Sequence, residues 1–175
     1  EMFLDSATLR SSIVSLAKHL GYIPSSKGGA SVYVDVSGGT DGSEFSIPKG
    51  TKFSTKIGTR IYTFLAMESH ASYFDDTTRT YKVDSVGIKE GVFNEVMYEF
   101  AGTPNEVFEI PSEDADLSTL VVSVAGEVYS KADDLTELTA TSKVYFVQEG
   151  DQNKYQIYFG DNVIGKKPNV SDQID

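Results

Sequence analysis

Residues 142–165, SKVYFVQEGDQNKYQIYFGDNVIG, decide the fold class of this chain. Apolar side chains alternate with more polar ones over 155–159, which is the period-two pattern of a strand with one apolar face. The run 144–147 is apolar on both faces, which is typical of an inner strand or of a strand covered on its second side by another part of an assembly. The polar residues 150–153 between the two runs tolerate turn dihedral angles. The stretch therefore predicts an antiparallel hairpin with a short loop.

Upstream of this hairpin, the chain has the pattern of a series of short strands. Valines at positions 32, 34 and 36 predict a half-buried strand, and the run 61–68, apolar on both faces, predicts a central one. Further strands are predicted at 81–88, 92–100, 107–110, 120–124 and 127–129. About nine or ten short strands punctuated by Gly and Asp predict an antiparallel β-sandwich or barrel-like body.

The amino end has a different period. Leu9, Ile13, Leu16 and Leu20 recur on one face of a helix, which predicts an amphipathic helix in residues 1–24. The predicted fold class is therefore mainly β, with an N-terminal amphipathic helix followed by a β-rich body over residues 25–175. The apolar stripe of the helix either docks on the chain's own sheet or joins a bundle with helices of other subunits, so these four residues form a candidate assembly interface.

Charge and composition exclude several function classes. The formal net charge of −11 opposes contact with nucleic acid or an anionic membrane, and the 15 basic residues are scattered, with never more than two in a row. No apolar run is long enough to cross a bilayer. The chain has no cysteine, which excludes a disulfide scaffold and thiolate chemistry. Residue 1 is Glu rather than Met and lies close to the predicted start of the helix, and residues 172–175 carry no terminating signal. We therefore interpret the chain as a segment of a longer protein.

The sequence offers little catalytic chemistry. The two histidines, His19 and His70, have no metal-ligand spacing around them, and neither a nucleophile elbow nor a phosphate-binding loop is present. Acidic residues gather at 75–76, 113–116 and 133–134, in polar connections where solvated acids are common. We expect no enzyme activity, no catalytic residues, no metal and no cofactor. A spatial pair of carboxylates is not visible in sequence, so a tail glycosidase stays a minor alternative.

Three passages, taken in order, resemble one family. They are the lead-in and helix over 3–22, the turn IPKGTKF at 47–53, and the tract YFGDNVIG at 158–165. The last two are similar to the Ile-Pro-x-Gly-Thr-x-Phe and Phe-Gly-Asp-Gly-x-x-Gly elements of the baseplate wedge proteins of T-even-type contractile-tailed phages, within the baseplate J-like family. Asn162 replaces the second Gly, a mild departure because Asn tolerates a left-handed backbone. The residues that match the motifs are Pro48, Gly50, Phe159, Gly160, Asp161 and Gly165.

The resemblance implies a structural component of the virion. Such a subunit links baseplate wedges into a ring around the tail hub through protein–protein contacts with other wedge proteins, and is a homodimer in the assembled wedge. It is made in the bacterial host cytoplasm and ends in the tail baseplate. The motifs are fold motifs, so the resemblance assigns no catalytic role to them. The alternative is a carbohydrate- or receptor-binding β module of a phage tail, with exposed aromatic and acidic side chains as the contact set.

Overall fold

The computed structural model describes residues 26–38, 43–132, 136–150 and 154–175. These residues form two compact units. Residues 29–94 form the first, which we call the sheet unit, and residues 26–28 together with the described part of 95–175 form the second, which we call the barrel unit. The chain passes from one unit to the other at Gly28–Gly29 and again at Asn94–Glu95.

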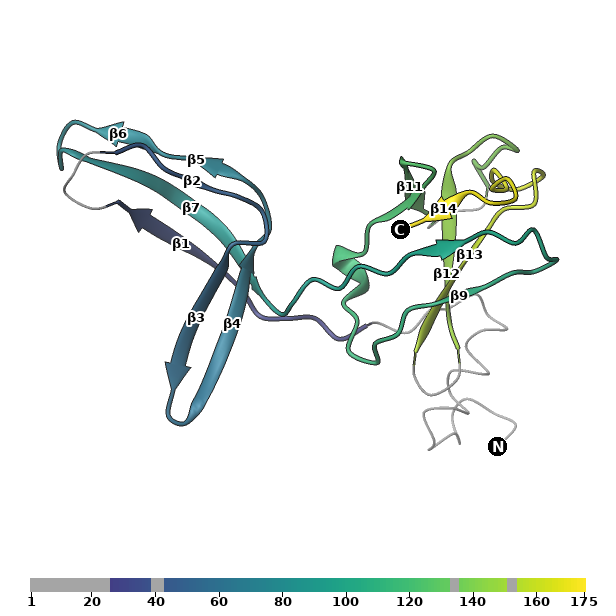
Figure 1. Cartoon of the computed structure of the whole chain (residues 1–175), viewed down its shortest axis with the longest axis horizontal. Helices are drawn as coiled ribbons and strands as arrows, with labels where there is room; N and C mark the ends of the chain where they lie inside the picture. Colours follow the sequence, from purple (N-terminus) through teal and green to yellow (C-terminus); the bar gives the residue numbers. More distant parts are fainter. Residues whose placement is uncertain (1–25, 39–42, 133–135, 151–153) are drawn as a thin grey trace. The chain divides into compact units, whose positions relative to one another are not determined.

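The sheet unit contains a five-stranded sheet and a separate strand pair (Figure 1). The five-stranded sheet has the order β1-β7-β4-β3, with β6 also paired to β7, and it has the form of a half-barrel. Strands β2 and β5 form the pair. The strands are β1 (Ser31–Ser37), β2 (Ser46–Ile47), β3 (Lys52–Ile57), β4 (Arg60–Ala66), β5 (His70–Ala71), β6 (Tyr73–Asp75) and β7 (Thr80–Glu90).

Strand β7 organises the sheet unit. It pairs with β1 along one edge, while β6 and β4 share its other edge near the two ends of the strand. Val83, Val86 and Ile88 of β7 are buried in the small core of this unit. Between Val83 and Val86 the strand changes register at Ser85, which has a φ of 55° and donates its amide hydrogen to Asp35 Oδ1 at 2.8 Å. This irregularity bends the strand, as β-bulges do.

Strands β3 and β4 extend beyond the rest of the sheet as a hairpin (Figure 1). Only Phe64–Ala66 of β4 pair with β7, so residues 55–62 pair with one another alone; we call them the hairpin arm. Gly58 and Thr59 form its two-residue turn, and the φ of 62° at Gly58 supplies the positive dihedral angle that such a turn requires at its first position. The hairpin arm is therefore a two-stranded ribbon exposed to solvent.

The barrel unit is built on a seven-stranded sheet in the order β8-β14-β10-β11-β12-β13-β9. Most pairs in it are antiparallel, but β11 and β12 pair in parallel. A single 3-10 turn, Leu117–Thr119, is capped by the Asp116 side chain. The strands are β8 (Tyr98–Glu99), β9 (Phe108–Glu109), β10 (Val122–Val124), β11 (Glu127–Lys131), β12 (Val144–Glu149), β13 (Tyr155–Phe159) and β14 (Gln173–Ile174).

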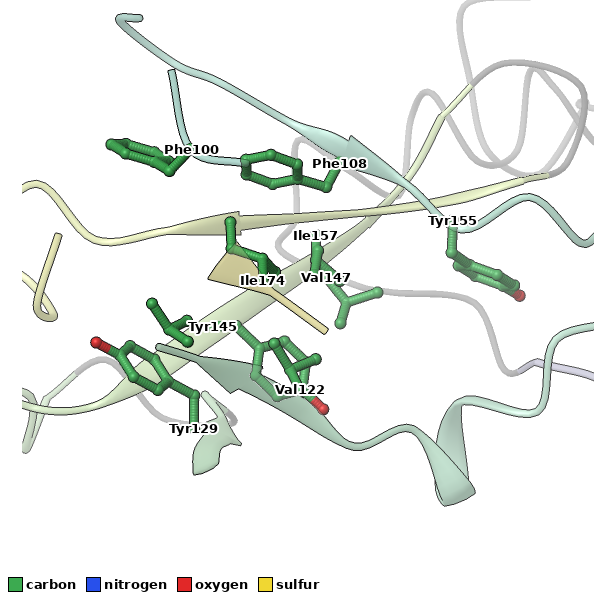
Figure 2. Close-up of a cluster of buried hydrophobic side chains, with 10 residues drawn as sticks. Phe100, Phe108, Val122, Tyr129, Tyr145, Val147, Tyr155, Ile157 and Ile174 are labelled. Carbon is green, nitrogen blue, oxygen red and sulfur yellow. The ribbon is translucent and has the colours of Figure 1, made fainter. Parts of the chain in front are cut away.

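The seven-stranded sheet curls until its two end strands meet. Tyr98 of β8 packs its ring on Phe108 of β9, with 5.4 Å between ring centroids, and the Tyr98 hydroxyl donates to the Glu109 carbonyl. The sheet is thus a nearly closed barrel. Figure 2 shows the side chains of its core gathered between the strands, among them Phe100, Phe108, Val122, Tyr129, Tyr145, Val147, Tyr155, Ile157 and Ile174. Val124 belongs to the same core.

The predicted fold class, an N-terminal helix followed by one antiparallel body, is wrong. The strands are divided between two units, and one pair of them is parallel. Within the described ranges, the 3-10 turn is the only helical element. Residues Leu9, Ile13, Leu16 and Leu20, on which the helix was predicted, lie outside the described residues. The predicted boundary between residues 24 and 25 lies there too and stays a prediction.

Two individual strand predictions hold only in part, for a common physical reason. The run 61–68 is central only at its end, because Ile61 belongs to the hairpin arm and is 71% exposed. In the run 92–100 only Tyr98–Glu99 forms a strand, and Val92, Phe93 and Met97 are exposed in the segment that connects the units. Apolar alternation indicates an extended backbone, but it does not show whether a neighbouring strand covers that backbone.

Replacing Val122 by Ala is expected to lower the free energy of unfolding of the barrel unit by about 2 kcal/mol, from two lost methyl groups and the cavity they leave. Val122 is 1% exposed, whereas its neighbour Val121 is 61% exposed and provides the matched control. Urea unfolding followed by tyrosine fluorescence measures both variants, since the chain has no tryptophan. Equal losses for Val122→Ala and Val121→Ala would contradict the assigned core.

Candidate functional site

The Gly160–Gly165 tract leaves β13 as a tight turn whose backbone closes on itself. A Cβ placed on Gly160 would lie 2.2 Å from the carbonyl oxygen of Gly165 and 2.3 Å from that of Ile164, closer than any side chain allows. The Asn162 amide donates to the same Gly165 carbonyl at 3.0 Å. Glycine at position 160 is therefore required by the close approach of two backbone segments.

Asp161 and Asn162 hold the turn with their side chains. Asp161 Oδ1 accepts hydrogen bonds from the amides of Val163 at 2.9 Å and Ile164 at 3.0 Å, and these two donors lower the pKa of the carboxyl group. Asn162 has a φ of 68°, and its Oδ1 accepts from the Lys167 amide at 2.9 Å. Asn therefore occupies the left-handed position at which the resembling family has glycine.

The turn is anchored to the segment that precedes β12. The Gly165 amide donates to the Thr139 carbonyl at 3.0 Å, and the Lys166 amide donates to the Ser142 carbonyl at 2.8 Å. Phe159, at the end of β13, packs on the barrel core with its ring 5.9 Å from that of Phe108 and 5.7 Å from that of Tyr129. The tract thus connects the barrel core to an outer loop, and its side chains are engaged in holding its own shape.

Beside this turn lies an open hollow of about 770 Å³ in the surface of the barrel unit. The turn forms one side of it, the loop 103–107 forms another, and the outer face of β12 and β13 forms its floor. Lys167 reaches across the Phe100 ring at the border, with its Nζ 5.7 Å from the ring centroid. This hollow is the candidate binding surface of the barrel unit.

The floor of the hollow has a defined pattern of side chains. Phe146 and Tyr158, opposite each other on β12 and β13, stack with 5.1 Å between ring centroids and 21° between ring planes. The next pair on that face is Gln148 with Gln156, joined by a side-chain hydrogen bond of 3.1 Å. An aromatic pair next to an amide pair offers apolar area together with hydrogen-bonding groups.

Glu106 shapes the loop that borders the hollow, and sequence analysis missed it. Its carboxylate accepts hydrogen bonds from the amides of Ala101, Gly102 and Thr103 at 3.0 to 3.1 Å. An acid two residues after the Gly102-Thr103-Pro104 sequence was the available signal, because carboxylates form strong hydrogen bonds with free backbone amides.

The Ile-Pro-Lys-Gly-Thr-Lys-Phe element forms a turn in the sheet unit. The Thr51 amide donates to the Pro48 carbonyl at 3.1 Å, and Gly50 has a φ of 84° at the second central position. Pro48 is therefore the first residue of a type II turn, one position earlier than the place the sequence pattern favours. This turn and the Gly160–Gly165 turn belong to different units.

Acidic side chains of the described residues are engaged mainly with nearby amides and cations. Asp75 accepts from the Thr77 amide, Lys82 and Thr78, and these contacts lower its pKa to about 2. Within the described part of the chain, no group of three or more His, Asp or Glu side chains is placed to hold a metal ion. No helix among those residues has the length and apolarity to span a bilayer.

The positions predicted from sequence are only partly brought together. Phe159, Gly160, Asp161 and Gly165 form one structure beside the hollow, whereas the candidate assembly residues of the amino end lie outside the described residues. The described units present turns, exposed strands and an open hollow. These features are typical of a structural β protein that works through contacts with other macromolecules.

Comparison with known proteins agrees with that class. No protein-family model matches the chain. The chain is similar to the baseplate wedge protein gp6 of Enterobacteria phage T4, with 24% identity over 169 residues, which is 94% of this chain and 25% of that protein. The chain thus spans about a quarter of the length of this relative. This distant similarity supports a structural role in a phage baseplate, and the name of the relative suggests a role that is not enzymatic.

Replacing Gly160 by Ala is expected to destabilise the barrel unit by about 1–3 kcal/mol, because the new methyl group must displace the backbone carbonyls of Ile164 and Gly165. Gly28 is the control, since a Cβ there has its nearest neighbour at 3.8 Å and its φ is not positive. Thermal unfolding of the two variants provides the comparison. If Gly160→Ala unfolded at the same temperature as Gly28→Ala, the tight turn described here would be incorrect.

Proposed function

We propose that this chain is part of a structural subunit of a contractile phage tail baseplate wedge. In this role the subunit joins neighbouring wedges into a ring around the tail hub through protein–protein contacts, and it is present as a homodimer in the assembled wedge. Its partners are other baseplate proteins, and its location is the virion tail. The observation that carries the proposal is the similarity to a baseplate wedge protein over 94% of this chain.

The geometry is consistent with this role. The polar side chains of the Gly160–Gly165 turn form hydrogen bonds with its own backbone. Their role is therefore to fix the conformation of the turn rather than to act on a substrate. Several large apolar side chains on both units are exposed, among them Ile61, Val128 and Val163. Exposed apolar side chains rimmed by polar ones are what an assembly subunit buries against its neighbours.

A nonsense mutation of the encoding gene, placed before the codon of residue 26, tests this function in the phage that carries it. Under the proposal, infected cells accumulate separate wedges that do not close into a ring, and plasmid-borne wild-type protein restores complete baseplates. Electron microscopy of lysates and mass spectrometry of purified tails give the readout. Complete, infectious tails that lack the chain would rule the proposal out.

The hollow of the barrel unit favours a second candidate, binding of a carbohydrate receptor. The stacked Phe146–Tyr158 pair and the Gln148–Gln156 pair combine ring surface with amide groups on one outer face. Such a combination can contact the C–H faces and the hydroxyl groups of a sugar.

An array of bacterial surface polysaccharides distinguishes this candidate from a purely structural role. Specific binding by the chain that is reduced at least roughly tenfold by Tyr158→Ala, and unchanged by Tyr33→Ala, would support it. Tyr33 is 77% exposed in the sheet unit and makes a suitable control. Failure of the chain to bind any polysaccharide would exclude this second candidate and leave the baseplate role unaffected.

A further inference from the structure

The two parts of the chain carry very different charges. Residues 95–175 hold sixteen acidic and five basic residues, which accounts for a formal net charge of −11 in that segment alone. Residues 29–94 hold eight acidic and seven basic residues and are almost neutral. The barrel unit is therefore strongly acidic, whereas the sheet unit carries nearly as many cations as anions.

The cations of the sheet unit are concentrated on and near the hairpin arm. Residues 45–67 contain Lys49, Lys52, Lys56 and Arg60 and no acidic residue. Lys56 and Arg60 are exposed, and among the described residues neither has an ion pair, although Arg60 lies over the Tyr62 ring. Several other described lysines differ in this respect: Lys82, Lys143 and Lys154, for example, each pair with a carboxylate.

The tip of the hairpin arm combines charge with apolar surface on both of its faces. Lys56 lies opposite Ile61, and Ile57 lies opposite Arg60, so each face carries one isoleucine beside one cation. Ile57 is 66% exposed and Ile61 is 71% exposed. A surface that fits this tip must offer apolar side chains surrounded by carboxylates.

The outer face of the barrel unit offers that combination over β8, β14, β10 and β11. Ile174 and Val124 point into the core, which places their neighbours Asp175 and Ser123 on the outside, joined by a side-chain hydrogen bond of 2.8 Å. Val128 lies opposite Ser123 on the same face. We call the set Glu99, Val121, Val128 and Asp175 the acidic outer face; Val121 is 61% and Val128 is 67% exposed.

We propose that the hairpin arm of one copy of this chain docks on the acidic outer face of a second copy, head to tail. The inference deepens the proposed baseplate function, on which it rests, by naming the contact surfaces. Charge complementarity selects the second copy, because the acidic counterpart of the arm is present on the same chain. A head-to-tail contact repeats from copy to copy and closes into a ring when its rotation permits.

The energetic roles of the contacting groups differ. Exposed ion pairs each contribute little to affinity, so the cations mainly accelerate encounter and select orientation. Burial of the isoleucine on the docked face of the arm, Ile57 or Ile61, against Val121 and Val128 supplies the apolar area of the contact. The contact is therefore expected to weaken with salt and to be disrupted by reversed charge on the arm.

Self-association of the complete chain, measured by sedimentation velocity over a range of concentrations, tests the inference. Lys56→Glu/Arg60→Glu is expected to weaken association at least roughly tenfold at low salt, whereas Lys49→Glu/Arg79→Glu changes the net charge equally, outside the arm, and has a much smaller effect. Circular dichroism verifies that each variant is folded. A chain that stays monomeric at all concentrations, or equal effects of the two double variants, would overturn the inference.

A charge swap tests the direction of the contact. Glu99→Lys/Asp175→Lys is expected to weaken self-association as the arm variant does, and a mixture of the two double variants is expected to associate again. Lack of association in the mixture would overturn the head-to-tail contact, as would an arm that binds only other tail proteins. Failure of this inference is distinguishable from failure of the proposed function. If the subunit used a different interface, the charge variants would have no effect, but the nonsense mutation would still prevent ring formation.

Discussion

The barrel unit depends on the contact that joins the two ends of its seven-stranded sheet. The ring centroids of Tyr98 and Phe108 lie 5.4 Å apart, and the Tyr98 hydroxyl donates to the Glu109 carbonyl, so side-chain contacts hold the end strands together. A curled sheet encloses a volume that must be filled, and aromatic side chains fill it here. Because closure fixes the ends of β13 and β14, it also fixes the turn and the hollow on the outside.

The two units protect the unpaired edges of their sheets in different ways. The barrel unit protects its end strands by curling, whereas the sheet unit leaves both β3 and β1 at the edge of an open sheet. On the hairpin arm, Lys56 and Arg60 prevent indiscriminate pairing of the ribbon with other strands, as edge lysines do in many β proteins. Charge thus protects a ribbon that still has apolar side chains for one suitable neighbour.

Local patterns predicted the hairpin of β12 and β13 and the strand β7, because period-two alternation is a local property. The division into two units, the parallel β11–β12 pair and the exposure of Ile61 depend on which strands meet, and a single sequence does not contain that information. At the candidate site, the glycines were visible in the sequence, while the Phe146–Tyr158 stack was not. Its recognition requires the register between two strands.

Strand β14 affects how the protein folds during its synthesis on the ribosome. Ile174, 1% exposed, lies at the centre of the barrel core, and its strand bridges β8 and β10, which are synthesised about fifty to seventy-five residues earlier. Strands β8 and β10 therefore remain incompletely paired until residue 174 has left the exit tunnel. Synthesis of the intervening residues therefore sets an interval in which cellular chaperones can bind the incompletely paired strands.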